Sequence, residues 1–149
     1  MFVLRRAVEA DIESIYQVDK AVFTIPWSVE SIRDDIEDKD NRIYYVIDVD
    51  DQVIAYAGAW LVADEGQITN IAVLPNYRRQ GYGAILTRKL IKECFAQGMQ
   101  EIFLEVRVSN QAAQTLYRRL GFTVKGLRKQ YYSKPTEDAY IMSLVKEKE

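Results

Sequence analysis

The stretch IAVLPNYRRQGYGAILTRKLI, residues 71–91, places a short loop between two segments of different periodicity. The first segment is apolar and rich in branched residues, which is typical of a strand, and Pro75 ends it. The second carries apolar residues at helical spacing, and we expect a helix over Ala84–Gln97 that stops at Gly98. A strand, a helix and the next strand in this order predict a crossover within a mixed sheet.

The remainder of the chain adds strands and helices on both sides of this unit. Apolar and β-branched runs predict strands over residues 2–5, 44–48, 52–62, 67–74, 101–108, 122–125 and 139–146. Helical spacing predicts helices over residues 10–23 and 29–37, and a further helix from Ser109 or Asn110 to Leu120. Three consecutive strands before the loop indicate an antiparallel meander. We therefore expect an α+β fold with a mixed central sheet flanked by helices.

Composition limits the kind of protein that this chain can be. Its 149 residues, 48% apolar and 28% charged, suit one globular domain over residues 1–149. A net charge of −2 gives no global reason to bind nucleic acid or an anionic membrane, and no apolar run reaches the roughly 18 residues of a membrane span. A single cysteine, Cys94, and the lack of a signal-peptide pattern predict a cytoplasmic protein. The charged residues Lys146–Glu149 are expected to form a short solvated tail.

The sequence contains no histidine. It therefore lacks the commonest acid or base at neutral pH and the commonest metal ligand, and the usual Ser-His-Asp and Cys-His nucleophile systems are excluded. A zinc site would have only carboxylates and one thiol as ligands, so we expect no metal centre. Chemistry in this chain must rest on carboxylates, tyrosines, amines, backbone dipoles or the substrate itself.

The loop NYRRQGYG, residues 76–83, is a candidate anion site at the start of a helix. Gly81 and Gly83 lack a Cβ, so successive main-chain N–H groups can point into one concavity at the positive end of the helix dipole. Arg78 and Arg79 can add charge-assisted contacts. The alternative interpretation is an ordinary glycine turn with two solvated arginines.

Spacing separates this loop from two common phosphate loops. No lysine follows Gly83 before Lys89, as a P-loop requires, and Leu86 interrupts the Gly-x-Gly-x-x-Gly pattern of a dinucleotide site. The order of strand, proline, aromatic residue, Arg-x-x-Gly-x-Gly and helix resembles the acetyl-CoA loop of the GNAT superfamily of N-acetyltransferases. The resemblance continues through PWS at 26–28, LEVRVSNQAAQTLYRRLGF at 104–122 and RKQYYSKPTEDAYIMSL at 128–144, which are similar to the subfamily that acetylates ribosomal-protein alanine.

The resemblance implies acetyl-CoA as co-substrate and a set of residues that hold it. In the family fold, the strand before the loop and the strand bearing LEVRVSN splay apart, and the pantetheine arm enters between them. The implied contacts come from the main chain of Ile71, Ala72 and Val73, and from the loop residues Arg78, Arg79, Gln80, Gly81, Tyr82, Gly83 and Ala84. Asn110 would add a polar contact to the co-substrate, and asparagine is also a preferred residue at a helix N-cap.

The same resemblance assigns two catalytic roles. Glu105 matches the general base of the subfamily and Tyr117 the general acid that protonates the departing thiolate. The residues alone leave other interpretations open: Glu105 can be a surface glutamate paired with Arg107 or a neighbouring strand, and Tyr117 can be a core tyrosine with a solvated hydroxyl. A phenol with a pKa of ~10 stays protonated at neutral pH and can donate to a thiolate.

The acceptor is less well defined by the sequence. Trp27, Tyr131 and Tyr132 are candidates to line a peptide groove, although each can equally serve packing or strand formation. The subfamily resemblance implies that the acceptor is the amine of an N-terminal alanine of a small-subunit ribosomal protein. An α-amine of pKa ~7.7 to 8.0 is roughly a tenth neutral at pH 7, whereas a lysine is below about a thousandth, which favours N-terminal acceptors. A lysine or small-molecule acceptor, or a non-catalytic acyl-CoA-binding module, remains an alternative.

Overall fold

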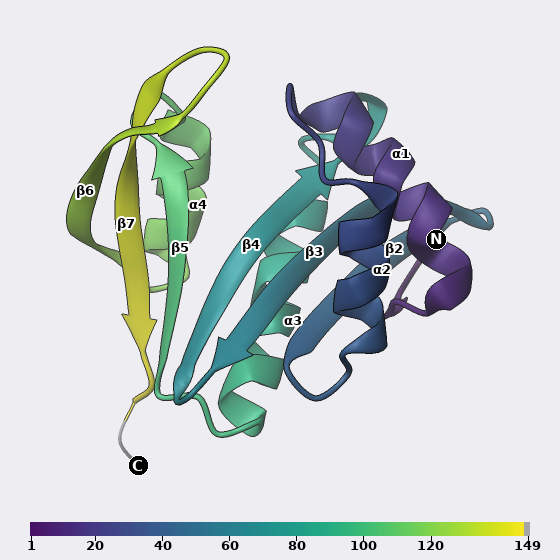
Figure 1. Ribbon diagram of the computed structural model, residues 1–149, viewed down its shortest axis with the longest axis horizontal. Coiled ribbons are helices and arrows are strands. Elements are labelled where there is room, and N and C mark those ends of the chain that lie inside the picture. The colour runs from purple at the N-terminus through teal and green to yellow at the C-terminus, as the bar shows by residue number, and fades with distance from the viewer. Residues whose placement is uncertain (148–149) are drawn as a thin grey trace.

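A computed structural model describes residues 1–147 of the chain (Figure 1). The strands are β1 Phe2–Arg6, β2 Arg42–Val49, β3 Gln52–Val62, β4 Glu65–Val73, β5 Glu101–Arg107, β6 Thr123–Tyr132 and β7 Glu137–Val145. The helices are α1 Ile12–Val22, α2 Val29–Glu37, α3 Tyr82–Ala96 and α4 Gln111–Arg119, with short 3₁₀ turns at Glu9–Asp11 and Pro75–Tyr77.

All seven strands belong to one sheet, in the order β1-β2-β3-β4-β5-β7-β6. Every neighbouring pair is antiparallel except β4 and β5, which are parallel and joined through α3. The predicted α+β class with a mixed, mostly antiparallel sheet is therefore confirmed. The meander is also confirmed, since β2, β3 and β4 pair in sequence order.

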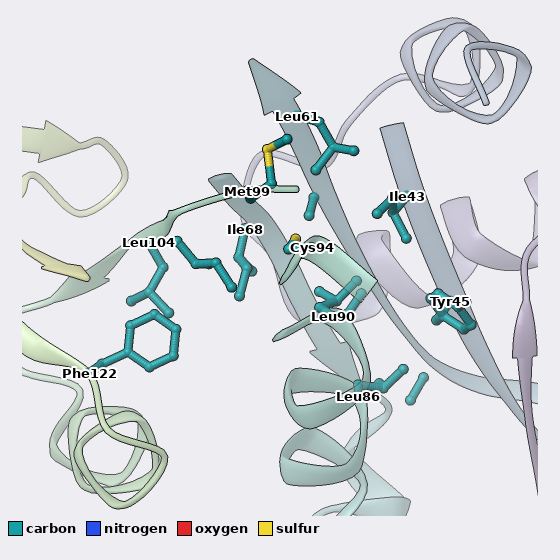
Figure 2. Packing of buried hydrophobic residues seen from close by; sticks show 14 of the residues in the cluster. Ile43, Tyr45, Leu61, Ile68, Leu86, Leu90, Cys94, Met99, Leu104 and Phe122 are labelled. Atoms are coloured by element: carbon teal, nitrogen blue, oxygen red, sulfur yellow. The ribbon is translucent and has the colours of Figure 1, made fainter. Parts of the chain in front are cut away.

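Two apolar layers cover the two faces of the sheet. On one face α1 and α2 pack their isoleucines and valines against β2 and β3. On the other, Leu86, Leu90 and Cys94 of α3 fill the space behind the sheet, and Phe122 closes the layer beyond β5 (Figure 2). Because the sheet is covered on both faces, its central strands are nearly continuous runs of buried residues. Cys94 is fully buried, as its place on the apolar face of α3 predicts.

The parallel pairing of β4 and β5 covers only the start of each strand. It consists of Glu65 with Glu101, Gly66 with Ile102, and Gln67 with Phe103, and beyond these the two strands diverge (Figure 1). The splayed strands implied by the family resemblance are present. Main-chain groups of residues 68–73 and 104–107 that face the gap consequently have no strand partner across it.

Several boundaries differ from the sequence-based expectation. The strand expected over 122–125 extends to Tyr132, because β6 is an exposed edge strand whose residues show no buried alternation for a pattern to detect. Helix α3 begins at Tyr82, two residues before the expected start, and the cap of α4 is Asn110. Of the expected solvated tail, Lys146 and Glu147 are exposed, and residues 148–149 lie outside the described part of the chain.

A bulge in β4 changes which way its side chains face. Gly58 of β3 pairs with Asn70 and Ala59 pairs with Ile68, so Thr69 is an extra residue on β4. Ile68 therefore packs with the α3 layer while Ala72, four residues on, packs with the α1 and α2 layer. In an uninterrupted strand these two side chains would share a face.

The Tyr44 ring packs closely against Gly58, which lies on β3 opposite the bulge. A Cβ on Gly58 would lie 2.8 Å from the Tyr44 ring, a distance that no ordinary contact allows. The ring cannot move away freely, because its hydroxyl donates a 2.6 Å hydrogen bond to Asp35 of α2. Glycine at position 58 is thus required by the buried tyrosine on the neighbouring strand.

We expect Gly58→Ala to lower the free energy of unfolding by about 1–3 kcal/mol, the usual cost of overpacking a core. Urea denaturation followed by circular dichroism measures it. Gly126→Ala is the matched control, because a Cβ at that strand position meets only Ile141 Cδ1 at 3.8 Å, an ordinary contact. Equal midpoints for Gly58→Ala and the wild type would contradict the packing argument.

Candidate active site

A cavity of about 620 Å³ occupies the gap between the diverging strands β4 and β5. Its walls come from both strands, the α1–α2 loop, α4 and the end of β6, which are distant in sequence. Seven of the residues singled out from the sequence line it: Trp27, Ile71, Glu105, Asn110, Tyr117, Tyr131 and Tyr132. Ala72, Val73 and the loop residues 78–84 lie outside its lining.

Glu105 sits midway along β5 and faces the cavity, opposite in direction to the buried Leu104 and Val106. Its Oε1 accepts a weak hydrogen bond of 3.4 Å from Gln67 Nε2 and lies 3.9 Å from Arg128 Nε. Burial raises the pKa of this carboxyl, and the Arg128 charge and the Gln67 hydrogen bond oppose that rise. The carboxylate is consequently more basic than one in water.

The ion-pair partner suggested by sequence proximity, Arg107, is engaged elsewhere. Its Nη1 lies 3.2 Å from Glu137 Oε1 and its guanidinium stacks over the Tyr132 ring at 4.3 Å from the centroid. Glu105 therefore meets Arg128 from β6 instead. Because Arg128 is half exposed, this contact is screened by solvent, and Glu105 keeps an oxygen edge open to the cavity.

Tyr117 reaches the cavity from the opposite side, on α4. Its ring packs against Phe122, with centroids 6.0 Å apart at 59°, and this contact fixes the direction of the side chain. Burial raises the pKa of its phenol to about 12, so the hydroxyl is protonated throughout the neutral range. Tyr117 is a packed tyrosine that also lines the cavity, and its role as general acid stays a prediction.

The loop before α3 has the conformation of an anion site. Arg79 has φ 63° and Gly81 has φ 85°, and such left-handed residues turn neighbouring N–H groups toward one side. Within residues 1–147 no protein acceptor receives a hydrogen bond from the main-chain N–H groups of residues 79–84. A Cβ at Gly81 would have open space around it, so the approach is unobstructed.

These donors suit the phosphate groups of a coenzyme A molecule, and the free strand edges of the gap suit its amide-bearing arm. Arg78 ties the loop to the end of β4, because its Nε donates a 3.2 Å hydrogen bond to the carbonyl oxygen of Val73. Its contact with the coenzyme stays a prediction. Asn110 is a true cap of α4, since its side chain accepts a hydrogen bond from Ala113 N at 3.1 Å. Its further role as a coenzyme contact stays a prediction.

Two pairs of aromatic residues line the cavity. Trp27 packs edge-on against Trp60, with centroids 5.6 Å apart, and Tyr131 packs edge-on against Tyr132 at 5.0 Å. The loop that carries Trp27 is held by Asp19, a buried carboxylate that accepts a 2.7 Å hydrogen bond from Trp27 N. The same carboxylate accepts hydrogen bonds from the Tyr56 hydroxyl and from Asn70 Nδ2 of β4.

The sequence analysis did not identify Gln67, Asp19, Trp60 or Arg128 as site residues. Gln67 and Arg128 meet Glu105 from 38 and 23 positions away along the chain, and no local pattern marks such pairs. The signal available for Asp19 is its position on the apolar face of α1, beside Ile15 and Val18, where a carboxylate requires a buried partner.

A model of the acetyltransferase (GNAT) family matches residues 12–122. The chain belongs to this family. An Escherichia coli K12 ribosomal protein bS18-alanine N-acetyltransferase is 36% identical over 138 residues, which cover 90% of each chain. A Bacillus subtilis protein whose name gives the same activity provisionally is 40% identical over 132 residues, covering 89% of this chain and 87% of the relative.

Solved structures of GNAT proteins agree with the fold. The Escherichia coli ribosomal-protein-S18-alanine N-acetyltransferase superposes with a TM-score of 0.88 at 33% identity, covering 97% of this chain and 94% of the other. Ard1 from Thermoplasma volcanium superposes with a TM-score of 0.86 at 26% identity, covering 99% of each. Within residues 1–147 no helix has the length and apolarity to cross a membrane, and no three metal-binding side chains lie together.

We expect Tyr56→Phe to destabilise this GNAT domain by about 1.5–3 kcal/mol at neutral pH, because it removes a hydrogen bond to a buried carboxylate. Burial raises the pKa of Asp19 and the Tyr56 hydrogen bond lowers it, so the variant raises that pKa further. A raised folded-state pKa gives stability that is lost as pH increases through it. The difference from wild type should therefore shrink on acidification.

Urea denaturation between pH 4 and 8 measures this difference. Tyr45→Phe is the control, since Tyr45 is a buried residue of the neighbouring strand whose hydroxyl makes no hydrogen bond to protein within residues 1–147 and is not shut off from solvent. If the loss of stability in Tyr56→Phe did not change with pH, the Tyr56 hydrogen bond would not be linked to the ionisation of Asp19.

Proposed function

We propose that this protein transfers the acetyl group of acetyl-CoA to the amine of an N-terminal alanine of a small-subunit ribosomal protein. The observation that carries the proposal is the place of Glu105, largely buried in the gap between the splayed strands and in one cavity with Tyr117 and the aromatic residues Trp27, Tyr131 and Tyr132. The names of the relatives, at 36% identity across 90% of the chain, support this acceptor. A ribosomal acceptor would place the enzyme in the cytoplasm.

The residues that hold the co-substrate are the N–H groups of residues 79–84 and the free edge of β4 from Ile71 to Val73. When bound, acetyl-CoA supplies a thioester carbonyl that an amine can attack without a covalent enzyme intermediate. The parallel pairing of β4 and β5 ends at Gln67, whose side chain contacts Glu105, so the free edge of β4 begins directly across the gap from Glu105. The loop and this edge orient the arm along the cavity.

Glu105 accepts the proton that the acceptor amine releases. Its raised pKa moves it toward the range in which a carboxylate is an effective general base, and its open oxygen edge lets an amine approach. An α-amine suits such a base, since its pKa of ~7.7 to 8.0 leaves roughly a tenth of it neutral at pH 7. A lysine amine would demand a stronger base than one carboxylate.

Tyr117 supplies the proton for the leaving group. Its phenol has a pKa of about 12 and is held in place by Phe122, so it is protonated and oriented before the reaction begins. Transfer to a thiolate of conjugate pKa near ~8.5 would leave a phenolate, which must be reprotonated from solvent before the next turnover.

Acetylation assays should show transfer to a peptide with a free N-terminal alanine, and little transfer to a blocked peptide with one lysine or to a polyamine. Mass spectrometry of the products locates the acetyl group. We expect Glu105→Gln and Tyr117→Phe each to lower kcat about 10²-fold or more with little change in acetyl-CoA binding. Glu101→Gln is the matched control on the same strand, where the carboxylate instead accepts a hydrogen bond from Ser143.

Acetyl found only on the lysine peptide would overturn the assignment of the acceptor. Tight acetyl-CoA binding with no transfer to any amine would mark a binding module instead of an enzyme. Full activity in both Glu105→Gln and Tyr117→Phe would contradict the two catalytic roles while leaving the acceptor assignment intact.

The pH profile tests the role of Glu105 separately. Below the pKa of the acceptor amine, kcat/KM should fall with a slope of one, and below the pKa of Glu105 with a slope of two, because both groups must be unprotonated. Arg128 lowers the pKa of Glu105, so Arg128→Gln should move the second break to higher pH. The first break belongs to the peptide and should stay fixed. A second break that does not move would contradict the assignment.

A further inference from the structure

Two consecutive tyrosines, Tyr131 and Tyr132, line the same cavity although both belong to strand β6. In a regular strand, neighbouring side chains point to opposite faces, so only one of the two could do so. Both face the cavity because β6 is irregular here. Arg128 pairs with Ala139 and Tyr132 pairs with Glu137, so three residues of β6 lie opposite the single residue Asp138.

The extra residues are held by a contact from Asp138. Gln130, in the middle of the bulge, has φ 52°, a left-handed conformation that is unfavourable for a residue with a Cβ. Its main-chain N–H donates a 2.8 Å hydrogen bond to Asp138 Oδ1. Such a charge-assisted contact, from the residue directly opposite on β7, offsets the unfavourable conformation of the bulge.

The bulge places the tyrosines beside the reacting groups. Tyr132 lies under the Arg107 guanidinium, and Tyr131 lies 5.4 Å from the guanidinium carbon of Arg128, whose Nε is 3.9 Å from Glu105 Oε1. Burial raises the pKa of both phenols, and the negative charge of Glu105 adds to that rise, which agrees with this proximity. An acceptor at Glu105 would lie beside this aromatic pair.

We propose that Asp138 is a positioning residue for the acceptor, acting through Gln130 to hold Tyr131 and Tyr132 at the wall of the cavity. Asp138 itself does not line the cavity, so it acts at one remove from the acceptor. Its neighbour Glu137 makes a different contact, accepting a 2.7 Å hydrogen bond from Ser109 N next to α4. The two carboxylates thus tie β7 to the bulge of β6 and to the segment before α4 respectively. The proposal rests on the proposed acetyl transfer.

Three variants test it in the full-length enzyme with the N-terminal alanine peptide. Asp138→Ala should raise the KM for the peptide roughly tenfold, with kcat and the KM for acetyl-CoA within about twofold of wild type. Asp138→Asn keeps an acceptor oxygen and should stay near wild type. Adding Gln130→Gly to Asp138→Ala should recover much of the peptide KM, because glycine adopts positive φ without a Cβ clash.

Amide exchange by NMR without substrates gives a second readout, since the Gln130 N–H should exchange faster in Asp138→Ala than in Asp138→Asn. An unchanged peptide KM in Asp138→Ala would overturn the proposal, as would equal rises in both KM values with a lowered Tm, or a Gln130→Gly addition that recovers nothing. In these cases the wild type still acetylates the peptide, so the proposed function stands. A wild type that acetylates no N-terminal peptide would instead remove the proposed function, and the acceptor role of Asp138 with it.

Discussion

The parallel pairing of β4 with β5 stops after three residue pairs, and the rest of the site depends on that interruption. Each strand keeps a full antiparallel partner on its other side, β3 for β4 and β7 for β5, so the gap does not cost either strand its place in the sheet. Main-chain donors and acceptors that would otherwise be consumed by the sheet become available to a ligand. A crossover helix with a free N-terminus then stands at the open end of the gap.

On both sides of this gap, irregular strands place side chains in positions that regular alternation would not allow. The bulge at Thr69 turns the second half of β4, so that Asn70 donates a hydrogen bond to the buried carboxylate of Asp19. The same carboxylate holds the loop that carries Trp27. The bulge opposite Asp138 brings two successive tyrosines to one wall. In both strands the departure from alternation converts a structural element into part of a binding surface.

The order of the elements, the crossover and the anion loop could be predicted because each has a local signal: periodicity, Pro75, and the glycines at 81 and 83. Alternation along β5 also sufficed to place Glu105 on the face opposite Leu104. The full length of β6 could not be predicted, because an exposed edge strand buries too little to show a pattern. The partners of Glu105 could not be predicted either, since tertiary structure brings Gln67 and Arg128 to it. Arg107, which is nearer in sequence, instead contacts Glu137 and Tyr132.

The burial of Cys94 has a consequence for chemical selectivity. Its place behind the sheet raises the pKa of the thiol to about 12, so it stays protonated at neutral pH and is shielded from solvent. A thiolate in reach of a thioester would exchange with it and divert acyl groups onto the protein. The only thiol in the chain is buried in the α3 layer. An activated acyl donor therefore meets no accessible sulfur nucleophile, and peroxides meet no accessible cysteine.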